Sequence, residues 1–101
     1  MAGSLIPLPD TIGDGNKSVT TAGTAVVLST SIASKKVTIT ANINNSGIIC
    51  VGASTVVANQ TGRRGTPLFP GDSLSLEISN VGLIYIDATV NGDGVTYTYL
   101  N

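Results

Sequence analysis

Apolar and polar residues alternate along much of the chain, which is the pattern of a β-strand with one buried face. The alternation runs from Lys36 to Ile43, from Ser73 to Ile78 and from Ile84 to Val90. Successive side chains of a strand point to opposite faces of a sheet, so each segment is expected to bury one face. The apolar residues expected on the buried faces are Val37, Ile39, Ala41, Ile43, Leu74, Leu76, Ile78, Ile84, Ile86, Ala88 and Val90.

Three further segments complete the strand pattern. Val26-Val27-Leu28 is a short buried run, Ile48-Ile49-Cys50-Val51 is apolar on both faces, and the last strand carries Val95, Tyr97 and Tyr99 on one face. Turn residues separate these segments, no segment has helical spacing, and a longer connection from Ala53 to Pro70 is expected to cross between sheets. The pattern predicts an all-β protein, a single small β-sandwich with jelly-roll or Greek-key-like connections and about seven or eight strands.

The first sixteen residues differ from the rest. Pro7 and Pro9 bracket Leu8, and the stretch closes on Gly13-Asp14-Gly15. Proline removes a hydrogen-bond donor and favours extended backbone, so we expect no strand or helix here. The predicted organisation is an extended N-terminal arm, residues 1–16, followed by a β-sandwich domain, residues 17–101.

Charge and composition narrow the function. The chain has 5 basic and 6 acidic residues, which gives a net charge of −1, and only 11% of its residues are charged. This balance provides no electrostatic basis for binding nucleic acid or an anionic membrane. There is no histidine, and the single Cys50 cannot form an internal disulfide. With no secretory signal pattern and no apolar run of membrane-spanning length, we expect a protein made and assembled in a reducing cytoplasm.

The chain offers few groups for catalysis or metal binding. Asp87 lies in mid-strand, where we expect it on the solvated or interface face, although a buried acid is the alternative. Cys50 is expected in the core. The oxygen-rich segments from Asp10 to Asn16 and from Asn91 to Gly94 lack the spacing of a calcium loop, and turn chemistry explains both. We predict no catalytic residues, no metal site, no cofactor and no enzymatic activity.

Surface character favours contact with other proteins. The outward strand positions are Thr, Ser and Asn rather than Lys and Glu, and such a face is poorly protected against association. The arm carries large apolar residues that would gain most by lying on another subunit, although a frayed terminus is the alternative. Arg63 and Arg64 form a small basic loop tip. The candidate partner-binding residues are Leu5, Ile6, Leu8, Ile12, Arg63 and Arg64.

Two segments of the chain have similar residue patterns. An offset of 47 residues relates Ile39 to Ile86, Ala41 to Ala88, Asn44 to Asn91 and Gly47 to Gly94. A duplicated hairpin explains this, and so do two hairpins that obey the same turn chemistry, with Asn and Gly tolerating positive φ. The second explanation is the simpler.

From Asn45 onward four motifs follow in a distinctive order. They are Asn45-Ser-Gly-Ile-Ile-Cys-Val-Gly52, Pro67-Leu-Phe-Pro-Gly-Asp-Ser73, Leu83-Ile-Tyr-Ile-Asp-Ala88 and Gly92-Asp-Gly-Val-Thr-Tyr97. Pro70-Gly71 suits a type II turn, with Asp72 or Ser73 able to cap its amides. In this order the motifs resemble the small β-sandwich structural proteins of tailed-bacteriophage virions, which include head decoration (cement) proteins and fibre domains. Cys50 stands where that family is expected to have an aromatic residue.

The resemblance implies a structural virion part with no catalytic residues. We expect a decoration protein that binds the mature phage head, bridges major capsid subunits and stabilises the lattice as a homotrimer on the outer surface. A receptor- or carbohydrate-binding module of a head or tail fibre is the alternative. For that alternative the aromatic candidates are Phe69, Tyr85, Tyr97 and Tyr99, with the last two expected on an edge or terminal strand.

Overall fold

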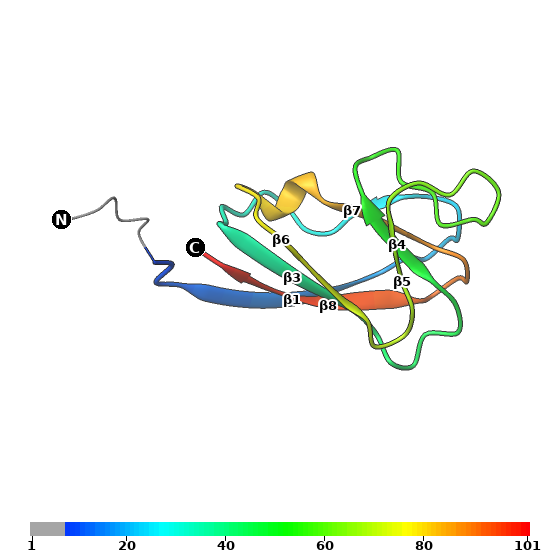
Figure 1. Cartoon of the computed structure of the whole chain (residues 1–101), viewed down its shortest axis with the longest axis horizontal. Coiled ribbons are helices and arrows are strands. Elements are labelled where there is room, and N and C mark those ends of the chain that lie inside the picture. Colours follow the sequence, from blue (N-terminus) through cyan, green and yellow to red (C-terminus); the bar gives the residue numbers. More distant parts are fainter. Residues whose placement is uncertain (1–7) are drawn as a thin grey trace.

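The computed structural model describes residues 8–101, which form a β-sandwich of two four-stranded antiparallel sheets (Figure 1). One sheet has the strand order β1-β8-β3-β6 and the other β2-β7-β4-β5. The strands are β1 (Ile12–Ser18), β2 (Val26–Val27), β3 (Lys36–Ala41), β4 (Ile49–Gly52), β5 (Thr66–Leu68), β6 (Ser73–Leu76), β7 (Tyr85–Ala88) and β8 (Gly94–Leu100), with a short 3₁₀ turn η1 (Val81–Leu83) before β7.

The strand pairs are nested along the chain. β1 pairs with β8, β2 with β7, β3 with β6 and β4 with β5, so the chain forms one long antiparallel ribbon folded back on itself. The ribbon is then joined sideways, β3 to β8 in one sheet and β4 to β7 in the other. This nested order is that of an eight-stranded jelly roll. The prediction of an all-β sandwich with jelly-roll connections is confirmed.

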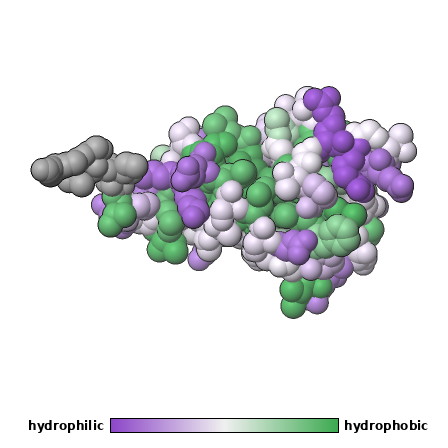
Figure 2. Space-filling model, in the orientation of Figure 1, coloured by the Kyte–Doolittle hydropathy of each residue, from purple (hydrophilic) through white to green (hydrophobic). Residues whose placement is uncertain are grey.

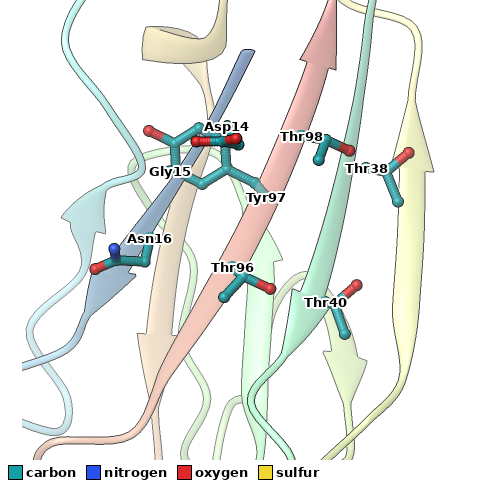
Figure 3. Close-up of a pocket in the computed structure, with 8 residues that line it drawn as sticks. All are labelled: Asp14, Gly15, Asn16, Thr38, Thr40, Thr96, Tyr97 and Thr98. Carbon is teal, nitrogen blue, oxygen red and sulfur yellow. The ribbon is translucent and has the colours of Figure 1, made fainter. Parts of the chain in front are cut away.

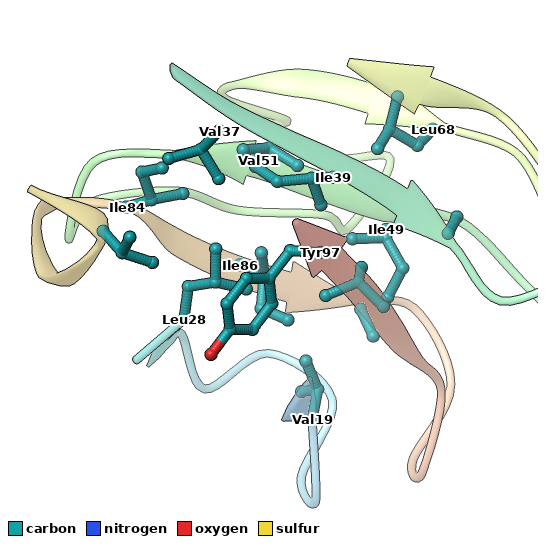
Figure 4. Close-up of a cluster of buried hydrophobic side chains, with 14 residues drawn as sticks. Val19, Leu28, Val37, Ile39, Ile49, Val51, Leu68, Ile84, Ile86 and Tyr97 are labelled. Atoms are coloured by element: carbon teal, nitrogen blue, oxygen red, sulfur yellow. The ribbon is translucent and has the colours of Figure 1, made fainter. Parts of the chain in front are cut away.

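The core lies between the two sheets and is contributed by both (Figure 4). Most apolar positions that the alternation assigned to a buried face are buried, including all three from β3. Cys50 is also fully buried, as expected, but on the opposite face of β4. The central cluster consists of Val19, Leu28, Val37, Ile39, Ala41, Ile49, Val51, Leu68, Val81, Ile84, Ile86, Ala88, Val95 and Tyr97.

Two apolar positions depart from the predicted pattern. Ile43 is 78% exposed and Val90 is 37% exposed, because β3 ends at Ala41 and β7 ends at Ala88. Beyond Ala41 the chain turns, and the Asn45 amide donates to the Asn42 carbonyl. Period-2 alternation continues past the strand ends in the sequence, but the side chains no longer have a facing sheet to pack against.

The prediction that residues 1–16 contain no strand is wrong. β1 begins at Ile12 and pairs with β8 over its whole length, with Gly13 opposite Tyr99 and Gly15 opposite Tyr97. The tyrosine rings lie over the two glycines, where a Cβ would overlap them. The rings thus supply the buried surface that the glycines lack, as in aromatic rescue of glycine in a sheet. β8 is therefore a central strand, and the expectation that its tyrosines lie on an edge strand is also wrong.

Turn chemistry shapes the connections. The Asp72 amide donates to the Phe69 carbonyl across Pro70-Gly71, and Gly71 has a φ of 88°, which makes the predicted type II turn. The Asp72 carboxylate caps this turn by accepting from the Phe69 amide at 3.1 Å. Within residues 8–101 only glycines have positive φ, so the asparagines of the two turns related by the 47-residue offset do not use that conformation. No helix in the described range is long and apolar enough to cross a membrane.

Candidate functional site

Two large apolar side chains are exposed where β1 begins, Leu8 before the strand and Ile12 as its first residue. Leu8 is 86% exposed and Ile12 is 74% exposed. The backbone between them is fixed: the amides of Asp10 and Thr11 both donate to the Asn101 carbonyl at 2.9 Å, and the Asn101 amide donates back to Thr11. Leu8 therefore extends from a backbone segment that hydrogen bonds hold in place. The other two apolar candidates of the arm, Leu5 and Ile6, lie outside the described residues.

The two candidate arginines lie elsewhere. Arg63 and Arg64 are exposed in the loop that joins β4 to β5, at the end of the sandwich away from the N-terminal segment (Figure 1). Figure 2 shows strongly hydrophilic residues gathered at that end. Of the four predicted residues in the described range, the structure thus places Leu8 and Ile12 at or before the start of β1 and the two arginines at the opposite end.

The Asp87 carboxylate holds two loops at the end of the sandwich that carries Arg63 and Arg64. Its side chain is on the outer face of its sheet but only 1% exposed, because two loops cover it. One carboxylate oxygen accepts from the Gly23 amide at 3.0 Å and the other from the Ala58 amide at 2.9 Å. The expectation of a solvated Asp87 is wrong, and the alternative of a buried acid holds. Both oxygens bind backbone amides, so the carboxylate stabilises the loops.

Cys50 lies beside Asp87 in the second small core. The two residues are directly paired across β4 and β7, and Val56 and Ala58 of the β4–β5 loop cover the cysteine. Burial raises the pKa of the Cys50 thiol, nearby Arg63 lowers it and the Asp87 carboxylate raises it. Since burial is the largest cause, the thiol is held in its neutral form.

A pocket of about 360 Å³ opens between the loops that Asp87 anchors. The loops come from the β1–β2 connection, the β4–β5 connection and the end of β7, and they meet only because β7 lies between β2 and β4. Of the four predicted residues that the structure describes, only Arg63 lines this pocket; Arg64 pairs its backbone with Val57 instead. The lining residues are Ala22, Gly23, Asn59, Gln60, Arg63, Ala88 and Thr89.

A second, shallower hollow of about 320 Å³ lies on the outer face of the β1-β8-β3-β6 sheet (Figure 3). The short side chains there are matched in register, and the hydroxyls of Thr38 and Ser75 bond at 2.9 Å, those of Thr40 and Ser73 at 2.7 Å. The expected polar, weakly charged strand face is present on this sheet. Two rows cross it: Asp14, Thr98, Thr38 and Ser75 in one, and Asn16, Thr96, Thr40 and Ser73 in the other.

The two turns related by the 47-residue offset, residues 44–47 and 91–94, are hydrogen-bonded to each other in the fold. The Asn45 side chain exchanges two hydrogen bonds of 2.9 Å with the backbone of Gly94, and the buried Asp93 carboxylate accepts from the amides of Ser46 and Gly47. In the Asn91 to Gly94 segment, the Asp93 oxygens therefore serve turn structure, as predicted. The same prediction is wrong for Asp14 and Asn16, because both lie in strand β1. Among residues 8–101 no group of three or more Cys, Asp or Glu side chains is placed to hold a metal ion.

Comparison of this chain with protein-family models, with curated proteins and with solved structures gives no match. The resemblance to phage virion proteins therefore rests on the order of the sequence motifs.

Sequence reasoning missed most of the loop pocket. Asn59 and Gln60 read as ordinary turn residues before Gly62, and Thr89 reads as the end of a strand. Nothing in the sequence places the β1–β2 loop beside them, because that contact depends on which strands are neighbours in the sheet. The threonine rows had a visible signal, the Thr38-Ile-Thr40 and Thr96-Tyr-Thr98 repeats.

Proposed function

We propose that this protein is a structural virion protein, a capsid decoration protein that binds the mature head of a tailed phage and bridges its major capsid subunits. Three features support the proposal. The first is the order of the sequence motifs, and the second is a jelly roll whose first and last strands are hydrogen-bonded neighbours. The third is that the buried carboxylates accept hydrogen bonds from loop amides. The proposed location is the outer surface of the phage head, reached by assembly in the host cytoplasm.

The exposed apolar segment before β1 carries the proposal. Leu8 and Ile12 are largely exposed, yet the backbone between them is bonded to Asn101, so the segment leaves the domain from a fixed point. Burying each of these side chains in a neighbouring subunit contributes about 1.5–3 kcal/mol. A protein that binds only the mature lattice stabilises it by mass action.

The weakly charged threonine face is the second proposed contact. Its hydroxyls can form direct or water-mediated hydrogen bonds with a neighbouring subunit. Asp14 is the one charged side chain among the residues that line its hollow, so few ionised groups are desolvated. A homotrimer is proposed because cyclic symmetry suits a site on a local three-fold axis of a shell.

The proposal is tested by attachment to purified mature heads. Removing residues 1–9 deletes Leu8 but leaves the bonds between Thr11 and Asn101, so the domain should stay folded. We expect this truncation and Leu8→Ser to weaken binding to heads at least tenfold. The matched control is Ile43→Ser, which removes an equally exposed apolar side chain far from the arm in sequence.

Two results would contradict the proposal. One is a truncated protein that binds heads as tightly as the full chain. The other comes from quantitative mass spectrometry of phage particles, where a ratio near one copy per major capsid protein is expected. A handful of copies per particle would instead favour a neck, tail or fibre location.

A receptor- or carbohydrate-binding module remains the second candidate, and the loop pocket is the observation that favours it. The aromatic platform suggested for it is weaker than the sequence indicated, because Tyr97 and Tyr99 face the core and pack over the glycines of β1. Of the four aromatic residues, Phe69 is the one with a largely exposed ring, at 58%. Binding on a glycan array together with weak head binding would favour this candidate.

A further inference from the structure

We propose that the pocket between the β1–β2 and β4–β5 loops binds the carboxylate of an acidic sugar. Its location at the end of the sandwich away from the N-terminal segment makes it independent of the proposed capsid contact (Figure 1). Its volume of about 360 Å³ is within the range of small-ligand sites and accommodates one sugar unit.

Two side-chain oxygens of the pocket, those of Asn59 and Thr89, already accept from backbone amides. The Asn59 side-chain oxygen accepts from the Thr61 amide at 3.0 Å, which leaves the Asn59 NH₂ group to donate. The Thr89 hydroxyl oxygen accepts from the Ile48 amide at 3.0 Å, which leaves its hydrogen to donate. Together with the Arg63 guanidinium, these NH₂ and OH donors suit an anionic ligand.

Arg63 supplies the charge. It is the one charged side chain among the seven residues that line the pocket. Its Nε–H donates to the Ala58 carbonyl at 2.9 Å, which fixes the guanidinium and leaves both terminal NH₂ groups for a ligand. A fixed guanidinium suits a carboxylate, with charge-assisted hydrogen bonds to its oxygens.

The site is rigid before any ligand binds. Asp87 holds Gly23, which lines the pocket, and Ala58, which precedes the pocket residue Asn59, through two amide hydrogen bonds. The backbones of Val57 and Arg64 also exchange two hydrogen bonds, of 3.1 and 2.9 Å. Little ordering is therefore needed on binding. A single guanidinium among the lining residues matches a singly charged ligand better than a phosphate dianion.

The neutral groups point to a sugar. Beside the single guanidinium the pocket has the side-chain amides of Asn59 and Gln60 and the hydroxyl of Thr89, which are groups that hydrogen-bond to sugar hydroxyls. A uronic acid combines one carboxylate with several such hydroxyls. For a ligand of this size a dissociation constant on the order of 1 mM is expected.

The test is a two-dimensional amide NMR titration of the full chain with glucuronate, and with glucose and inorganic phosphate as separate arms. Glucuronate is expected to shift the amides of Gly23, Asn59, Gln60 and Thr89 with a single saturating affinity. Glucose and phosphate are each expected to bind at least tenfold more weakly. Equal binding of glucose, or tighter binding of phosphate, would overturn the assignment of an acidic sugar.

Two variants and one control separate a built site from general charge attraction. Arg63→Gln removes the guanidinium, and Asn59→Asp replaces the donor by a negative charge while keeping the acceptor for the Thr61 amide; each should weaken glucuronate binding at least tenfold. Arg64→Gln makes the same charge change one residue outside the pocket and should alter affinity less than twofold. Equal losses at the two arginines would refute the proposal. Because Asn59→Asp preserves the loop bond, it tests the site even if Arg63→Gln loosens the loop.

Discussion

Replacing Asp87 by Asn tests whether one buried carboxylate holds the loops on the outer face of its sheet. The two residues have nearly the same shape, so packing is retained. The carboxylate accepts from Gly23 and from Ala58, one amide on each oxygen. Asn has a single acceptor oxygen, so one of these amides would face an NH₂ group and lose its partner.

The magnitude follows from the burial of these groups. A hydrogen bond to a charged group contributes about 1.5–3 kcal/mol, and a buried amide left without a partner costs about 1–3 kcal/mol. One bond is lost and the other becomes neutral, so Asp87→Asn should lower the free energy of unfolding by about 2–4 kcal/mol. In a domain of this size that corresponds to a fall in Tm of roughly 10–25 °C.

Thermal and urea unfolding measure this change, and amide hydrogen exchange locates it. Gly23 and Ala58 should exchange faster in the variant, while amides in the middle of β8 should keep their relative protection. Asp14→Asn, on the exposed face of β1, is the matched control and should stay within about 0.5 kcal/mol of the unchanged protein. If Asp87→Asn were equally neutral, the view that this carboxylate holds both loops would be refuted.

Three further predictions concern single positions. Gly15→Ala places a Cβ against the Tyr97 ring and should lower stability in urea by about 1–3 kcal/mol, whereas Asn16→Ala on the outer face should not. Gly71→Ala, at a φ of 88°, should lower Tm through about 1 kcal/mol of turn strain. Burial raises the pKa of Cys50, so the unfolded chain ionises first and the thiol's contribution to stability is lost as pH rises above roughly 8.5. Urea midpoints across this pH range should therefore fall less in Cys50→Ala than in the unchanged protein.

Each of these predictions has an opposing result. A neutral Gly15→Ala would mean that the tyrosine rings move aside without loss, and an unchanged Tm for Gly71→Ala would mean that the turn can change type. Parallel pH profiles for the two Cys50 forms would show that the thiol does not contribute to the alkaline loss of stability.

The sequence predicted the parts of the fold that depend on local pattern. β3 buries every second residue, and the apolar side chains of β3 and β7 mark the core directly. The Pro70-Gly71 turn was also predicted correctly, because its conformation is set by two residues. These features need only the chemistry of neighbouring positions.

The parts that were missed depend on contacts distant in sequence. β1 carries glycine where a strand usually carries a large apolar residue, and it exists because Tyr97 and Tyr99 reach across from β8. The alternation along β7 puts Asp87 on the face away from the core, where a solvated side chain is expected. Asp87 is buried because the β4–β5 loop folds over it. The loop pocket likewise depends on which strands are neighbours, which the pattern of one strand does not encode.

The start of β1 lies beside the end of β8, which gives the domain a directional response to mechanical load. The two strands are antiparallel neighbours. A force that separates the two termini acts along their interstrand hydrogen bonds and opens them one after another, as in unzipping. A force on the start of β1 that is resisted at the start of β8, the opposite end of the same strand pair, runs along the strands and loads those bonds together in shear. A load in that direction is therefore shared by all the β1–β8 bonds.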